Sequence, residues 1–198
     1  MDDLWWYLVR ASGIVAVALG VAAMFCGLLF SARDTGRWRR PNWWLDLHNQ
    51  LGGLALIFTA VHLVAVYADE FNGLGLVQIL VPFTAPDQTW GMALGVVSAW
   101  LFALVVFTSW PKRLFSRRVW RVVHLSSLVG LVLGGVHGYL TGYDAPTLAF
   151  RALLVAGLGI VVYATTIRLV SVLHRRVAKI SRNSRDRLPV GSRSTAKV

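Results

Sequence analysis

The sequence has few charged residues, little acidic charge and a single cysteine. Charged residues make up 15% of its 198 positions, whereas soluble globular domains have about 25%. Hydrophobic residues make up 56%. This composition excludes an ordinary soluble domain. Because Cys26 is the only cysteine, the chain cannot form an intrachain disulfide or a CxxC metal or redox motif.

Five stretches are long and apolar enough to cross a bilayer, which requires about 20 residues. They predict an all-α integral membrane bundle of five transmembrane helices within residues 1–174, followed by a basic, disordered cytoplasmic tail over residues 175–198. We interpret the first stretch as a retained helix, because its leading residues are acidic and no signal-cleavage pattern follows it. The stretches are Leu4–Phe30, Trp43–Tyr67, Trp90–Trp110, Val119–Leu140 and Thr147–Leu173.

A sixth apolar segment, Leu74–Phe83, is too short to span and is closely followed by prolines. We expect it to be re-entrant or to lie on the surface. Within the first stretch, Gly13, Gly20 and Gly27 recur every seven residues. We interpret these glycines as a small-residue stripe for ordinary helix packing.

The formal net charge of +11 first suggests a nucleic-acid partner. However, 17 of the 20 basic residues lie in three segments on one side of a five-helix arrangement: Ser31–Asn42, Pro111–Arg121 and the tail from His174. The positive-inside rule then predicts an external N-terminus and a cytoplasmic C-terminus in a multi-pass protein of the cell membrane. The basic face suits anionic lipid or an acidic electron donor, and no nucleic acid is expected.

Four of the five histidines lie inside predicted spans, where ionisable residues are rare and usually functional. His48 and His62 are on the second span, and His124 and His137 are on the fourth, which runs parallel to it. The separations of 14 and 13 residues correspond to about 21 Å and about 20 Å along a helix. Two levels result, each with one imidazole from each helix. Two haem b groups with histidine axial ligands to the iron fit this pattern.

The pattern also has an unresolved detail and a competing interpretation. A step of 13 residues leaves His124 and His137 well over 100° apart around an ideal helix, so tilt, offset or distortion must bring them into line. Zinc ligands on one helix usually lie about three to five residues apart, and neither that spacing nor HExxH occurs here. We expect His174, at the end of the fifth span, to be structural.

Haem propionates need cationic or polar partners, and three arginines are candidates. Arg121 lies one turn before His124 and suits the inner haem, the one nearer the predicted cytoplasmic face. Arg10 and Arg151 lie in the outer parts of the first and fifth spans, nearer the predicted external face. The alternative for Arg10 and Arg151 is that they snorkel to the membrane interface.

The run Leu47-His48-Asn49-Gln50-Leu51-Gly52 leading to His62, with Trp120-Arg121-Val122-Val123-His124 leading to His137, resembles the ferric reductase-like transmembrane domain family. That group includes ferric reductases, the membrane domain of NADPH oxidases and the haem subunit of the periplasmic methionine sulfoxide reductase system. The resemblance implies His48 with His124 at an inner haem b, and His62 with His137 at an outer one.

Relatives of the oxidase type continue into flavin and nicotinamide domains, yet no GxGxxG motif is present here. We therefore expect an oxidoreductase component whose electrons come from a separate cytoplasmic flavin reductase or from quinone. An external protein, ferric ion or oxygen would accept them. The alternatives are a haem-free small transporter or assembly factor, and an anchor subunit of a redox complex that retains one haem.

Overall fold

The computed structural model describes residues 2–32, 41–70, 73–109 and 115–186. Across these ranges the chain forms five long helices, one short helix and no strand. All five long helices are long and apolar enough to cross a membrane, which confirms the predicted all-α membrane bundle. The helices are α1 (Asp2–Ala32), α2 (Pro41–Ala68), α3 (Leu76–Leu80), α4 (Thr89–Ser109), α5 (Arg117–Thr141) and α6 (Leu148–Asp186).

Short polar side chains and glycine set several helix ends. Ser116 caps α5, since its Oγ accepts a hydrogen bond from the backbone N–H of Val119 at 3.3 Å. At the other end of α5, the Gly142 N–H donates to the Gly138 carbonyl at 3.0 Å. Thr147 caps α6 in the same way as Ser116, with its Oγ1 accepting from Phe150 N at 3.2 Å. The α5–α6 connection is therefore a short, defined turn.

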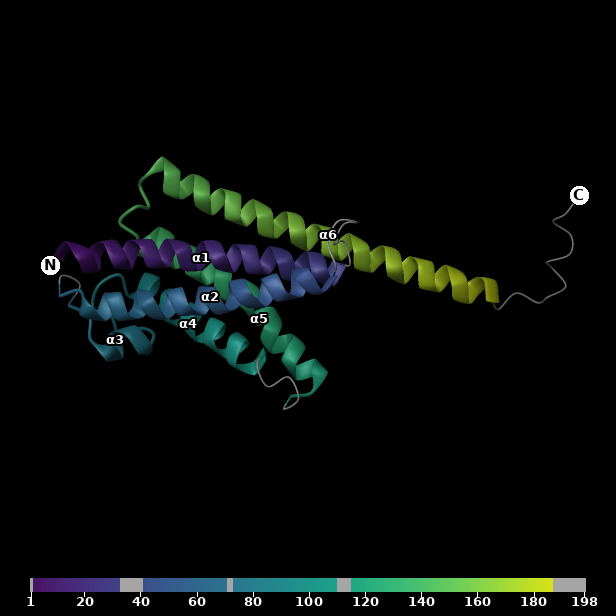
Figure 1. The fold of residues 1–198 in the computed structure, drawn as a ribbon, viewed down its shortest axis with the longest axis horizontal. Coiled ribbons are helices and arrows are strands. Elements are labelled where there is room, and N and C mark those ends of the chain that lie inside the picture. Colours follow the sequence, from purple (N-terminus) through teal and green to yellow (C-terminus); the bar gives the residue numbers. More distant parts are fainter. Residues whose placement is uncertain (1, 33–40, 71–72, 110–114, 187–198) are drawn as a thin grey trace, which may run out of the picture.

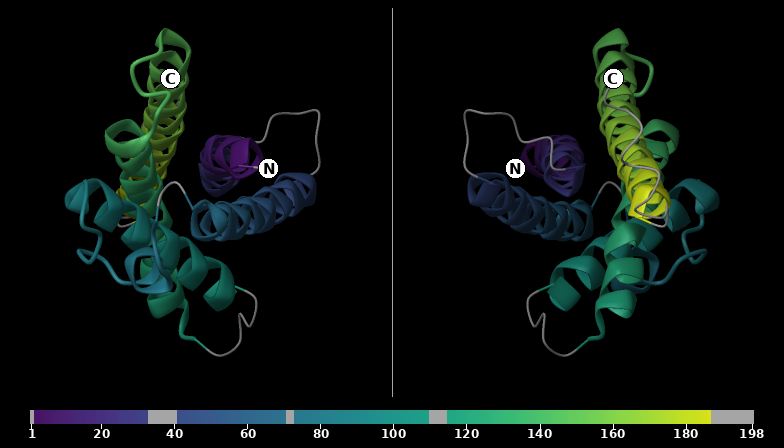
Figure 2. Two further views of the ribbon diagram at one scale, coloured as in Figure 1. Left: turned by 90° about the vertical axis from the view of Figure 1, so that its left-hand side faces the viewer. Right: turned by 90° about the vertical axis from the view of Figure 1, so that its right-hand side faces the viewer.

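The long helices pack as two hairpins with one added helix. α1 packs against α2, α4 packs against α5, and α6 lies along α1 on the side away from α2 (Figures 1 and 2). Smaller contacts of α1 with α5 and of α2 with α4 join the two hairpins. α5 runs obliquely across α1 and α2 (Figure 1). An oblique helix presents different faces to one partner along its length, which accommodates the 13-residue step between His124 and His137 within a continuous helix.

Small side chains occupy the interior of the bundle. The buried residues are mostly alanine and valine, together with Cys26, whereas many leucines, valines and aromatic residues lie on the outside. Small residues let helix backbones approach closely, and outward apolar side chains suit a lipid surrounding. The arrangement is that of a bundle solvated by lipid rather than by water.

The segment predicted to be re-entrant or surface-lying forms the five-residue helix α3. Ile79 is buried, and Trp100 of α4 donates its indole N–H to the Leu80 carbonyl at 2.9 Å. α3 thereby packs against α2 and α4 at the end of the bundle where α1 begins (Figure 1). We call this the α3 end, and the other the basic end, because it holds residues 174–186 of α6.

The tail departs from the prediction. α6 continues without a break past His174 to Asp186, so residues 175–186 are helical rather than disordered. An existing helix adds residues at little cost, and residues 175–186 contain neither glycine nor proline. At 39 residues α6 is about 58 Å long, well beyond the roughly 30 Å of a hydrocarbon core. Residues 187–198, residues 33–40 of the first basic segment and residues 111–114 of the second lie outside the described residues.

Candidate functional site

The four span histidines meet in two pairs between the hairpins. The imidazole centroids of His48 on α2 and His124 on α5 are 5.7 Å apart, with the rings at 64° to each other. Those of His62 and His137 are 6.4 Å apart, with the rings at 80°. Each pair takes one ring from each hairpin, which is the pairing that the sequence spacing predicted.

Helix α1 orients both histidines of α2. The Nδ1 atom of His48 lies 2.7 Å from the Ala23 carbonyl oxygen, and that of His62 lies 2.8 Å from the Val9 carbonyl oxygen. A carbonyl oxygen can only accept, so in each case Nδ1 carries the proton and donates it. The neutral ring then keeps its lone pair on Nε2. When Nε2 of a histidine binds a metal, its Nδ1 typically donates a hydrogen bond of this kind to a backbone carbonyl.

Helix α4 plays the same part for α5. The His137 Nδ1 donates to the Gly91 carbonyl at 2.8 Å, and the Thr141 hydroxyl lies 3.4 Å from the same nitrogen. The His124 Nδ1 lies 3.4 Å from the Ser109 hydroxyl. The His124 ring also stacks on the indole of Trp120, one turn earlier in α5, with centroids 4.8 Å apart and planes at 21°. Each histidine is therefore held by the neighbouring helix of its own hairpin.

Three glycines lie directly against histidine rings. A Cβ added at Gly13 would come within 3.1 Å of the His62 ring, and one at Gly27 within 3.0 Å of the His48 ring. At Gly95 a Cβ would come within 2.6 Å of His137 Nδ1. The stripe that we interpreted as ordinary packing thus has a second role. Only Gly20, whose Cβ would meet Leu131 and Phe102, fits the packing interpretation alone.

The donor set fits a group that is held from two opposite sides. An ion bound by two imidazoles on opposite sides, at the usual 2.0–2.1 Å, separates the ring centres by about 6.3 Å. The observed 5.7 Å and 6.4 Å are close to this value. Within the described ranges, no three His, Cys, Asp or Glu side chains gather around a common point as a small-ion site would require.

Two further features fit a bulky polar cofactor beside the histidines. The indole N–H of Trp120 is buried and has no hydrogen-bond partner among the described residues, although buried donors are normally paired. Gly52, one turn after His48 on the same face of α2, has open space where a side chain would begin. An acceptor group and a flat ring system would use the N–H and the space.

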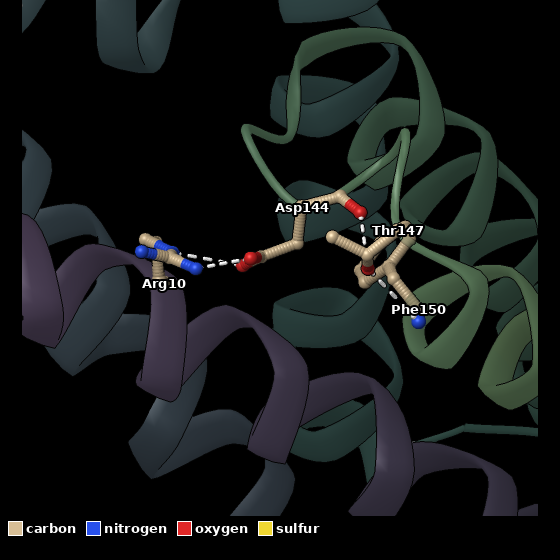
Figure 3. A network of polar contacts seen from close by, with 4 residues as sticks. All are labelled: Arg10, Asp144, Thr147 and Phe150. Carbon is tan, nitrogen blue, oxygen red and sulfur yellow. Dashed lines mark hydrogen bonds and ion pairs between the residues drawn. The ribbon is translucent and has the colours of Figure 1, made fainter.

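Arg10, a candidate propionate partner, forms an ion pair with Asp144 in the α5–α6 connection (Figure 3). Its Nε donates to Asp144 Oδ2 at 2.8 Å, its Nη2 donates to Oδ1, and its guanidinium lies 4.0 Å from the centroid of the Trp6 ring. Thr147 in turn donates its hydroxyl to the Asp144 carbonyl at 2.7 Å. Arg10 directly follows Val9, whose carbonyl anchors His62. The ion pair therefore lies near the His62–His137 level.

The other candidate residues lie at the surface. Arg151 donates from Nε to the Ala145 carbonyl at 2.9 Å and is exposed, and Arg121 is exposed on α5. His174 is exposed on α6, near the basic end. The predicted propionate roles of Arg10, Arg121 and Arg151 stay predictions.

Sequence reasoning missed the residues that hold the histidines in place. Gly13 and Gly27 are 14 residues apart, the same step as between His48 and His62, and this match signals the α1–α2 register. No comparable spacing in the sequence points to Ser109, to Asp144 or to the buried indole N–H of Trp120. Arg168 was also overlooked: it lies in the α6 span and donates to the Ser31 hydroxyl at 2.8 Å.

Comparison with known proteins identifies one family. The family model described as "Ferric reductase like transmembrane component" matches residues 12–135. The match includes His48, His62 and His124 and ends two residues before His137. Neither a curated protein nor a solved structure matches the chain.

Proposed function

The chain belongs to the ferric reductase like transmembrane component family, and domains of this family generally bind haem. Membership suggests a role in electron transfer within a membrane. We propose that the chain is a di-haem b electron conduit. The observation that carries this proposal is the meeting of His48 with His124 and of His62 with His137, at ring distances that would let each pair hold one iron. Bound haem would supply one-electron chemistry at iron. No side chain is assigned an acid–base or nucleophilic role.

The protein's own part is to hold and tune the ligands. Hydrogen bonds from Nδ1 to the carbonyls of Ala23, Val9 and Gly91 fix the ring orientation and leave Nε2 as the atom that would bind iron. They also raise the basicity of the ligand, which favours the oxidised metal. The two pairs are about 20 Å apart along the helices, so one would lie towards each face of the membrane.

The distribution of charged residues along the bundle supports an orientation in the membrane, and with it a direction for electron flow. The α3 end carries Asp69, Glu70, Asp87 and Asp144, whereas the basic end holds the basic residues 174–186 of α6. The segments 31–42 and 111–121, which follow α1 and α4 in the sequence, are also basic. By the positive-inside rule the basic end is cytoplasmic, which makes His48–His124 the inner pair and His62–His137 the outer pair. Electrons would enter from a cytoplasmic flavin reductase or from quinone and leave to an external protein, ferric ion or oxygen.

The test is a haem count and a reduced-minus-oxidised spectrum on the full chain purified from membranes. The proposal expects b-type bands and two haems per chain. His48→Ala and His124→Ala should remove one haem, and His62→Ala and His137→Ala the other. A haem-free protein would favour a transporter or assembly factor, one haem would favour an anchor subunit, and a crossed pattern of losses would refute the pairing.

A further inference from the structure

The anchoring of the histidines follows a repeated local pattern. On α1, the Val9 carbonyl accepts from His62 and Gly13, one turn later, lies against the same ring. The carbonyl of Ala23 and the glycine at position 27 do the same for His48. On α4, the Gly91 carbonyl and Gly95 serve His137. In each case a carbonyl at position i accepts the imidazole proton, and glycine at i+4 lets the ring approach.

The fourth position breaks the pattern. Ser109 lies against His124 Nδ1, where the other three positions have glycine. The carbonyl four residues earlier, at Val105, corresponds to those that accept an imidazole proton elsewhere. Here it accepts from the Ser109 hydroxyl instead, at 2.7 Å. Serine therefore stands between the imidazole and the carbonyl.

The proton positions follow from the chemistry of the groups. The Val105 carbonyl can only accept, so the Ser109 O–H points at it and turns the hydroxyl lone pairs outwards. At 3.4 Å, the contact between Ser109 Oγ and His124 Nδ1 is 0.6–0.7 Å longer than the carbonyl contacts of the other three histidines, at 2.7–2.8 Å. A longer contact gives a weaker hydrogen bond. The serine Cβ also fills the place where a ring at Gly95 or Gly27 makes its closest approach.

Building on the proposed function, we propose that Ser109 is a positioning residue that makes the His48–His124 haem electronically different from the His62–His137 haem. The Ser109 hydroxyl stands where a backbone carbonyl contacts the Nδ1 atom of each of the other three histidines. A weaker hydrogen bond leaves the His124 imidazole less electron-rich, and a less basic ligand stabilises the oxidised iron less. Ser109 thereby sets the reduction potential of this haem higher than a glycine at the same position would.

Two substitutions with opposite expected effects test the assignment. Ser109→Gly removes the Cβ and the hydroxyl that stand between the His124 ring and the Val105 carbonyl, so the ring can settle onto this carbonyl and the midpoint potential of one haem falls. Ser109→Ala removes the hydroxyl but keeps the Cβ, so the same potential rises. Each shift corresponds to at most about a tenfold change in the ferric-to-ferrous ratio, which is about 59 mV for a one-electron couple.

The readout is a potentiometric titration of the purified full chain, with the ferric electron paramagnetic resonance spectrum as a second measure of ligand strength. Ser109→Thr keeps a hydroxyl that can bond the same carbonyl, so its potential should stay near that of the wild type. Thr166→Ala is the matched control, because the Thr166 hydroxyl makes the same kind of bond within α6, to Val162 at 2.8 Å. Neither of its haems should shift.

The outcomes separate this inference from the proposed function. A wild-type protein without haem overturns the proposed function and, with it, the role of Ser109. Two haems with potentials that the Gly and Ala variants leave unchanged, or move in the same direction, overturn the role of Ser109 alone. Opposite shifts confined to the haem that His124→Ala removes support it.

Discussion

Arg10 and Asp144 lie 134 residues apart in the sequence and form a two-pronged ion pair. The pair ties the beginning of α1 to the α5–α6 connection (Figure 3). Because the Val9 carbonyl next to Arg10 anchors His62, the ion pair also fixes the part of α1 that orients the His62 ring.

Loss of the Arg10 charge is expected to cost stability. Arg10→Leu leaves the Asp144 carboxylate without its partner. About 1–2 kcal/mol of stability should be lost, less than the 3–5 kcal/mol of a fully buried pair, because the two side chains are 28% and 19% exposed. Thermal unfolding in detergent measures it. The double variant with Asp144→Leu removes both charges and should recover most of the loss.

The same position tests the predicted propionate contact. Asp144→Asn breaks the ion pair but leaves the Arg10 charge in place, so a haem that Arg10 contacts should stay bound and its potential should move less than in Arg10→Leu. Arg10→Leu removes the charge and should shift the potential of the haem bound by His62 and His137. Equal effects of the two variants would assign Arg10 to the ion pair alone.

Alanine at Gly95 should selectively disturb the His62–His137 haem. The added Cβ would lie 2.6–2.9 Å from three atoms of the His137 ring, so the ring must move away from the Gly91 carbonyl. Haem content after purification should fall from two towards one. Gly159→Ala is the control, because nothing lies within 4 Å of a Cβ there, and its haem content should equal that of the wild type. A full haem complement in Gly95→Ala contradicts the prediction.

Substitutions at Trp120 can separate the effect of ring stacking from that of hydrogen bonding at the His48–His124 pair. Trp120→Phe keeps an aromatic ring over His124 but removes the buried N–H, whereas Trp120→Leu removes both. If the N–H bonds a polar group of the cofactor, haem retention during dilution should fall in both variants, by about tenfold in Leu and less in Phe. Trp100→Phe, on the α3 side of α4, is the matched control.

The sequence predicted the features that depend on a single helix and missed those that depend on how two helices pack together. Apolar length marks all five spans, and the helical rise places His48 and His124 at one level and His62 and His137 at the other. Both are local properties of one helix. The Gly27 contact with His48, by contrast, depends on the register between α1 and α2, which periodicity within a single helix does not set.

Long-range and terminal features were harder to predict for related reasons. Asp144 carries no mark in the sequence of its pairing with Arg10, since the turn between α5 and α6 brings them together. Residues 175–186 have a basic, polar composition that is typical of tails, but they follow a formed helix and contain no helix breaker. The tendency of a formed helix to continue therefore decided the structure of residues 175–186, although their composition is typical of a disordered tail.

Membrane sidedness can be tested through the chain's single cysteine. Cys26 is buried in α1, so its replacement by alanine gives a background without thiols at little structural cost. Single cysteines are then placed at two exposed positions, Asp87 before α4 and Arg176 on α6. Positive charge is retained on the cytoplasmic side during insertion, so a membrane-impermeant thiol reagent should label Asp87→Cys in intact cells and Arg176→Cys only after permeabilisation. The reverse pattern would place the His62–His137 pair on the cytoplasmic side, and electrons would then enter at the α3 end.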